Sequence, residues 1–161
     1  MNNKNIIPLM VGLASLVWVG VAHASAPVIT SHFASSDLRP GDTWKIYLKA
    51  SDSDGDMRYI MATVKQAGVG VYPVGITRIR QENRKEFSGY VYLNTLGGTG
   101  LTFHTLTLTL WVQDRAGNFS DPVEVPLYFG SRAEAQAAPP AGAYQDQDLG
   151  PVMISLRSIG P

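Results

Sequence analysis

The chain of 161 residues contains no cysteine, which excludes a disulfide framework, a thiolate zinc site, an iron–sulfur cluster and a cysteine nucleophile. It also lacks an excess of either charge, because 13 Lys and Arg residues balance 13 Asp and Glu residues. Binding of nucleic acid or another polyanion through bulk positive charge needs such an excess, so the composition excludes this class. Long helical periods are absent as well, whereas 16 glycines and 10 prolines accompany many Thr, Val and Tyr residues, which favours β-structure.

The only long apolar run lies at the N-terminus. A short region with Lys4 precedes the apolar residues 6–21, and two small-x-small motifs follow, Ala22-His23-Ala24 and Ala24-Ser25-Ala26. This order predicts a cleaved signal peptide over residues 1–26, with an uncleaved N-terminal anchor as the alternative. We therefore expect an exported protein of the periplasm, the cell surface or the extracellular space, with no membrane insertion after cleavage.

Residues 27–130 alternate between strand patterns and turn residues. The expected strands are 28–33, 43–51, 57–65, 69–80, 86–94, 102–113 and 119–129. Alternation is clearest in 102–113, where Leu residues share one face and Thr residues share the other. About seven strands in about 100 residues predict an all-β, immunoglobulin-like antiparallel sandwich, and a small closed barrel is the alternative.

Two loop motifs carry a resemblance to a known family. The segment Ala50-Ser51-Asp52-Ser53-Asp54-Gly55-Asp56-Met57 contains an acidic D-x-D-G-D turn, and Val112-Gln113-Asp114-Arg115-Ala116-Gly117-Asn118-Phe119-Ser120 contains a D-x-A-G-N-x-S turn. Residues 27–130 thereby resemble the bacterial immunoglobulin-like domains of exported proteins, which are related in form to cadherin and fibronectin type III modules. The resemblance implies a β-sandwich that serves as an adhesive, spacing or ligand-binding module.

The acidic turn is a candidate calcium site. Asp52, Asp54 and Asp56 occupy alternate positions, so one short loop can aim several carboxylates at one point, as Ca²⁺ binding requires. Asp114 would join them if both loops lie at the same end of the sandwich, and Asn118 would supply a carbonyl oxygen. The alternative is an exposed turn in which the Asp side chains bond the backbone. No other cofactor is expected.

Trp111, Phe103 and Tyr128 are the candidate ligand-binding residues. By alternation, Trp111 and Phe103 fall on the Thr face of strand 102–113 rather than on its Leu face, and an exposed aromatic ring is what a sugar-stacking platform needs. The alternative is that the tail or a neighbouring domain covers Trp111, or that a shift of one residue reverses the two faces.

Two further segments have alternative interpretations. Arg78, Arg80, Arg84 and Lys85 form a basic cluster that either meets an anionic surface or is a solvated strand edge. Residues 131–161 begin with an Ala-, Pro- and Gly-rich stretch that predicts a flexible tail, followed by a possible short strand at 152–156. That strand would fold back on its own domain or add to the sheet edge of a partner.

The sequence contains no Gly-x-Ser-x-Gly elbow, no His-Glu-x-x-His pair and no phosphate-binding glycine loop, and we expect neither enzymatic activity nor catalytic residues. We expect a non-catalytic exported module that acts in structural or protein–protein interactions, with a protein or glycan partner whose identity the sequence does not give. A small carbohydrate-binding module that uses its exposed aromatic residues is the alternative.

Overall fold

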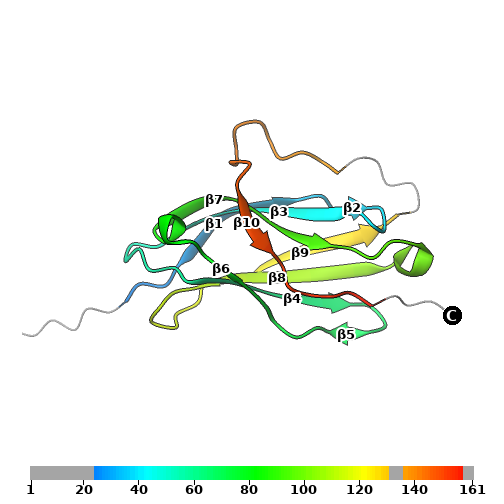
Figure 1. The fold of residues 1–161 in the computed structure, drawn as a ribbon, viewed down its shortest axis with the longest axis horizontal. Helices are drawn as coiled ribbons and strands as arrows, with labels where there is room; N and C mark the ends of the chain where they lie inside the picture. Colours follow the sequence, from blue (N-terminus) through cyan, green and yellow to red (C-terminus); the bar gives the residue numbers. More distant parts are fainter. Residues whose placement is uncertain (1–23, 131–135, 158–161) are drawn as a thin grey trace, which may run out of the picture.

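The computed structural model describes residues 24–130 and 136–157, and within these residues the protein is all-β. Its strands form a four-stranded and a six-stranded sheet that pack as a sandwich around an apolar core (Figure 1). The predicted all-β sandwich is therefore confirmed, and the closed barrel is excluded because the strands belong to two separate sheets. Residues 1–23, which hold most of the predicted signal peptide, lie outside the described residues.

The four-stranded sheet has the order β1-β3-β7-β10. Its strands are β1 (Val28–Ala34), β3 (Thr43–Ser51), β7 (Glu86–Asn94) and β10 (Asp148–Pro151). The six-stranded sheet has the order β2-β9-β8-β4-β5, and β6 also pairs with β4. Its strands are β2 (Asp37–Leu38), β4 (Tyr59–Gln66), β5 (Gly70–Val71), β6 (Gly75–Arg78), β8 (Thr105–Gln113) and β9 (Val123–Phe129). The described helices include the short 3₁₀ turns η1 (Gln81–Asn83) and η2 (Thr99–Leu101), and none of them reaches the length and hydropathy of a membrane span.

Alternation of buried and outward side chains builds the core. In β3, β7 and β8 every second residue is buried, as a strand with one packed face requires. Trp44 in β3 is fully buried, and its indole Nε1–H donates to the carbonyl oxygen of Ser35 at 2.8 Å. This bond satisfies the only polar atom of the ring and ties the connection between β1 and β2 to the core.

Several strand ends differ from those expected. The expected strand 69–80 is divided into β5 and β6, and Pro73, which has no N–H to donate to a sheet, lies between them. The expected strand 102–113 begins only at Thr105, because Phe103 has a φ of 66° and cannot extend the strand backbone. With the short strands included, the described residues form ten strands, whereas the pattern predicted about seven.

The C-terminal segment, residues 136–157, returns to the sandwich at β10. β10 pairs with β7 in parallel, whereas a strand was expected slightly later, at 152–156. After β10, the side chains of Val152, Ile154 and Leu156 are buried, with exposed residues between them. Of the two arrangements left open by the sequence, these described residues therefore adopt the intramolecular one, because their apolar side chains bury in the chain's own core.

Hydrogen bonds hold this segment to both sheets. The Val152 N–H donates to the Tyr92 carbonyl oxygen of β7 at 2.7 Å, while Thr77 Oγ1 of β6 donates to the Pro151 carbonyl oxygen at 2.5 Å. Further along, the Arg157 N–H donates to the Tyr72 hydroxyl at 2.7 Å. The segment thus closes one side of the sandwich by bonding across the gap between the two sheets (Figure 1).

Candidate functional site

The outer face of the six-stranded sheet carries a row of large apolar side chains. Ile76 of β6 pairs in register with Met61 of β4, and Met61 pairs with Trp111 of β8. Ile76 is 50% exposed, and Met61 and Trp111 are half-buried, whereas their chain neighbours on β4 and β8 are buried in the core. The structure therefore places Trp111 on the outer face, and cross-strand pairing extends its apolar surface over three strands.

An apolar hollow of about 320 Å³ adjoins this row. It is lined by Thr109, Trp111, Phe119, Ser120 and Pro122. Phe119 lies beyond the β8–β9 turn, where an isolated bridge pairs it with Gln113, and its side chain is 49% exposed. The Ser120 hydroxyl is fixed between two backbone groups, since it accepts from the Val112 N–H at 3.0 Å and donates to the Asp121 carbonyl oxygen at 3.0 Å. The hollow is thus built on a fixed turn.

The other two aromatic candidates lie elsewhere. Tyr128 pairs with Thr105 at the beginning of β8, which places it about 20 Å from Trp111 along the strand at about 3.3 Å per residue. Phe103 lies in the turn before β8 and is 67% exposed. The structure therefore does not bring Trp111 together with Phe103 and Tyr128 into one platform.

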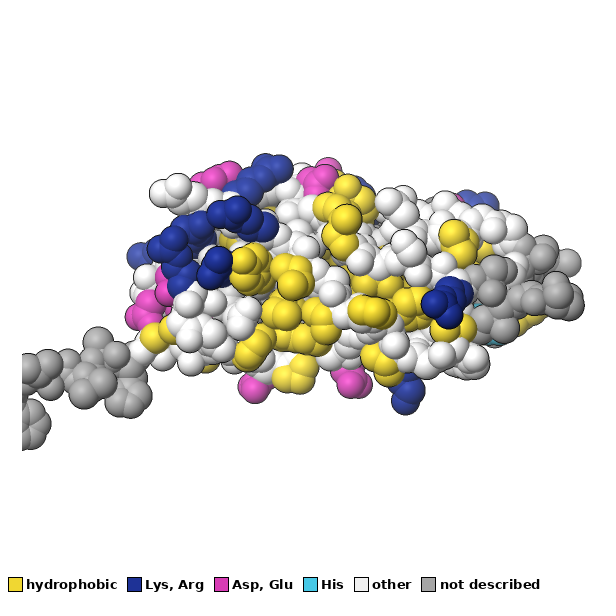
Figure 2. All heavy atoms as spheres, turned by 60° about the horizontal axis from the view of Figure 1, so that its bottom comes forward, with side chains coloured by type: hydrophobic (Ala, Val, Ile, Leu, Met, Phe, Trp, Pro, Cys, Tyr) yellow, Lys and Arg dark blue, Asp and Glu magenta, His cyan; other side chains and the backbone are white. Residues whose placement is uncertain are grey.

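Basic residues border one side of the apolar row. Arg78 of β6 pairs with Tyr59 of β4, two residues along these strands from the pair Ile76 and Met61. The Arg58 guanidinium lies 4.9 Å from the centre of the Tyr59 ring. In Figure 2, Arg and Lys side chains gather toward the left-hand end of the molecule, beside apolar side chains in the middle of that view. Within the predicted basic cluster, Arg78, Arg80 and Lys85 are exposed and Arg84 is half-buried.

The candidate calcium residues use their oxygens largely within their own loops. Asp52 is 4% exposed, and its two carboxylate oxygens accept from the backbone N–H groups of Asp54 and Asp56 at 3.1 and 3.2 Å. Asp114 is 2% exposed and accepts from the backbone N–H of Asn118 at 2.8 Å and from its Nδ2 at 2.7 Å. These are the bonds that the turn alternative predicts.

Asp56 brings the two loops into electrostatic contact. Burial, a hydrogen bond with the Asp52 side chain and the negative charge of Asp114 raise the pKa of its carboxyl above the ordinary value. Its Oδ1 atom is buried without a hydrogen-bond partner among the described residues. That part of the chain contains no group of three or more His, Cys, Asp or Glu side chains arranged to hold a metal ion, so calcium binding stays a prediction.

Neither a protein-family model nor a curated protein matches this chain. Function is therefore argued from the surface itself. Residue patterns singled out Trp111 but missed Met61, Ile76 and Phe119. Met61 and Ile76 join Trp111 only through the register of β4 with β6 and β8, and pairing between strands far apart in the sequence is not visible in a local pattern.

Proposed function

We propose that the protein is a non-catalytic, exported immunoglobulin-like module that binds a protein partner through the apolar row Ile76, Met61 and Trp111 and the adjoining hollow. The single observation that carries the proposal is the in-register row of partly exposed apolar side chains across β6, β4 and β8. A solvated sheet face normally carries polar side chains, as the Thr residues of β8 do, and exposed apolar patches mark interaction sites.

The strand order supports the immunoglobulin-like part of the proposal. The first, second and fifth strands of such a sandwich share one sheet, and the third, sixth and seventh share the other. Here β1, β3 and β7 share one sheet, and β4, β8 and β9 share the other. The signal-like N-terminal sequence supports export.

The borders of the row indicate the chemistry of the partner. Arg58 and Arg78 lie along one side of the row, next to Tyr59, and both are exposed. A partner with an apolar centre and carboxylates opposite these arginines complements this surface, because charges at an interface rim steer encounter and fix orientation. Its binding should weaken as ionic strength increases.

The test is site-specific photocrosslinking in the exporting cell, followed by binding measurements with the purified partner. A crosslinker at Ile76 or Phe119 should give a defined protein adduct, whereas one at Tyr128 on the same sheet should not. Calorimetry with that purified partner should show that Trp111→Ala raises Kd by about tenfold or more, as for a residue central to an interface. Arg78→Glu should raise Kd mainly at low salt.

Tyr128→Ala is the matched control, because Tyr128 is also an outward aromatic residue of this sheet and lies far from the row. Equal effects of Trp111→Ala and Tyr128→Ala on Kd would reject the row as the binding surface. A partner that binds the Trp111→Ala chain as tightly as the native chain would reject it as well.

A further inference from the structure

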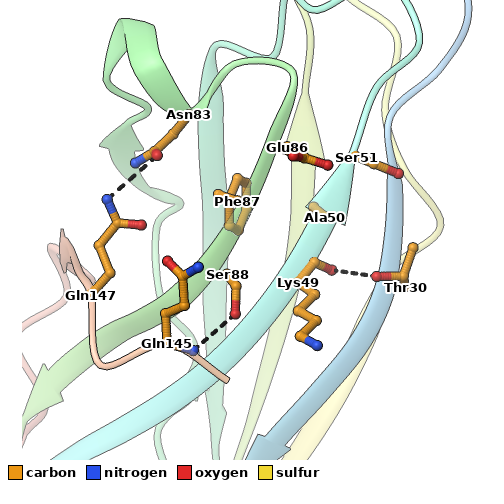
Figure 3. Close-up of a pocket in the computed structure, with 10 residues that line it drawn as sticks. All are labelled: Thr30, Lys49, Ala50, Ser51, Asn83, Glu86, Phe87, Ser88, Gln145 and Gln147. Atoms are coloured by element: carbon orange, nitrogen blue, oxygen red, sulfur yellow. Dashed lines mark hydrogen bonds between the residues drawn. The ribbon is translucent and has the colours of Figure 1, made fainter. Parts of the chain in front are cut away.

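The opposite face of the sandwich contains a cavity of about 490 Å³ with a mixed polar and apolar lining, here called the amide pocket. Residues of β1, β3 and β7 line it on one side, and Gln145 and Gln147 of the C-terminal segment line it on the other (Figure 3). The segment is fixed there by the Gln145 N–H, which donates to Ser88 Oγ at 3.0 Å, and by the Tyr90 N–H, which donates to the Gln147 carbonyl oxygen at 2.8 Å. The pocket therefore exists only because this segment docks on the sheet.

Several polar side chains of the amide pocket are free to bind a ligand. The side chains of Ser51, Glu86 and Gln145 have no hydrogen-bond partner within the described part of the chain. The Gln147 amide makes one long bond of 3.4 Å to Asn83 Oδ1. Hydroxyl and carboxamide groups both donate and accept, so the pocket presents both kinds of hydrogen-bonding group.

The charges of the amide pocket balance, since Lys49 and Glu86 are its only ionisable lining residues. An anionic ligand such as a phosphate would meet the Glu86 carboxylate, and a lipid tail would leave the amides and hydroxyls without partners. A neutral ligand rich in hydroxyl groups satisfies the lining without adding charge.

Three tyrosine rings lie on the sheet face beside the amide pocket, although none of them is among its lining residues. Tyr144, next to Gln145, packs against Tyr47 with ring centres 5.7 Å apart, and Tyr47 packs against Tyr90 at 5.5 Å. The Lys49 ammonium group lies 5.6 Å from the centre of the Tyr144 ring. An aromatic surface beside a set of amides and hydroxyls suits a pyranose, which has both apolar C–H faces and a rim of hydroxyls.

We propose that the amide pocket binds a neutral saccharide of about two sugar units, a size that fits its volume. This site lies on the opposite sheet from the apolar row, and neither proposal depends on the other. The sequence also suggested carbohydrate binding, but through Trp111. The present proposal assigns carbohydrate binding to Gln145, Gln147 and Ser51 instead.

The test uses the purified full chain and a fixed panel of probes. Saturation-transfer NMR and calorimetry with cellobiose, maltose, lactose and N,N′-diacetylchitobiose should show saturable binding of at least one disaccharide. Gln145→Ala should raise its Kd by about tenfold, the loss expected for one or two hydrogen bonds. The substitution keeps the backbone bond from Gln145 to Ser88, so the melting temperature should be unchanged. Ser51→Ala supplies a second variant on β3.

Gln113→Ala is the matched control, because Gln113 belongs to the opposite sheet. Absence of saturable binding to all four disaccharides would overturn the proposal, as would binding that both Gln145→Ala and Ser51→Ala leave unchanged. Loss of disaccharide binding in Trp111→Ala would show that the sugar binds at the apolar row and would reject the amide pocket as its site. Glycylglycine and inorganic phosphate complete the panel, and saturable binding of either without any disaccharide would assign the pocket to a charged ligand and reject the saccharide.

Discussion

Asp56 shows how one carboxyl in a crowded loop can oppose folding. Its folded-state pKa is raised above the ordinary value of 3.8 by burial, by a hydrogen bond with Asp52 and by the charges of Asp114, Asp52 and Asp54. A raised carboxyl pKa means that the folded state binds the proton more tightly than the unfolded state. The resulting stabilisation is present at acidic pH and is lost as the pH rises through the folded-state pKa, so the ionised carboxylate weakens the fold at neutral pH.

We therefore expect Asp56→Asn to raise the melting temperature at pH 7 by a few degrees, because the amide removes the repulsion from the neighbouring carboxylates. The gain should shrink as the pH falls through the raised folded-state pKa of Asp56, because the native carboxyl then takes up its proton and loses its charge. This difference in melting temperature is measured by thermal unfolding, monitored by circular dichroism between pH 3 and pH 8 in the presence of a chelator. Asp121→Asn, at an exposed position, is the control and should change little.

The same measurement tests the calcium prediction. If Asp52, Asp54 and Asp56 hold Ca²⁺, millimolar Ca²⁺ should raise the melting temperature of the native chain, and Asp56→Asn should abolish that rise. Equal melting temperatures of the native chain with Ca²⁺ and with chelator would reject the site and leave the turn as the role of this loop. An Asp56→Asn chain that is less stable than the native chain in chelator would contradict the repulsion argument.

At the scale of elements, local pattern predicted the long strands and failed for the short ones. The expected bounds of β3 and β7 agree with the structure because turn residues flank nine residues of strict alternation in each. β10 has only four residues and pairs with β7, more than fifty positions away in the chain. Its formation depends on a distant sheet edge, which no local period encodes.

Local sequence patterns were equally limited in predicting the candidate site. Alternation along β8 predicted that Trp111 points away from the core, because that property depends on one strand only. The apolar row and the amide pocket depend instead on register between strands and on docking of the C-terminal segment. The sequence predicted a flexible Ala- and Pro-rich tail with a possible strand at 152–156, but it did not show that Leu149, Val152, Ile154 and Leu156 bury against this chain's own sheets.

Gly89 is the position at which docking of the C-terminal segment can be tested. A Cβ at Gly89 would lie 2.5 Å from the Gln147 carbonyl oxygen, so Gly89→Ala forces β10 away from β7. We expect the free energy of unfolding in urea to fall by about 1–3 kcal/mol, as for overpacking of a close contact. Amide exchange at Val152, which donates to Tyr92, should accelerate.

Gly97→Ala is the matched control for this prediction, because a Cβ at Gly97 would meet nothing within 4 Å. Its stability and the exchange of Val152 should match the native chain. Unchanged exchange at Val152 in Gly89→Ala would show that docking does not depend on this close approach.

At the scale of the whole molecule, the acidic loop and residues Ala24 and Ser25 meet at one end of the sandwich. The Ser25 N–H donates to Asp54 Oδ2 at 2.6 Å, and Asn118 Nδ2 donates to the Ala24 carbonyl oxygen at 3.5 Å. The two small-x-small motifs predict cleavage either after Ala24 or after Ala26. Only cleavage after Ala24 leaves the Ser25 nitrogen at the new N-terminus, where it becomes an ammonium group beside Asp54.

Cleavage after Ala24, two residues before the end predicted at Ala26, would place an ammonium group at Ser25. We expect this group to stabilise the fold, because it offsets the negative charge that Asp52, Asp54 and Asp56 concentrate in one loop. Intact mass measurement of protein recovered from a host that exports it gives the cleavage site directly: a chain beginning at Ser25 carries this ammonium group, and a chain beginning at Pro27 lacks it. Asp54→Asn should raise the melting temperature of a chain made to begin at Pro27, because it relieves repulsion with Asp56, and should raise it less or lower it in the chain that begins at Ser25, which also loses its ammonium partner. The difference between these two chains separates capture of the N-terminus from a purely local role of Asp54 in its turn.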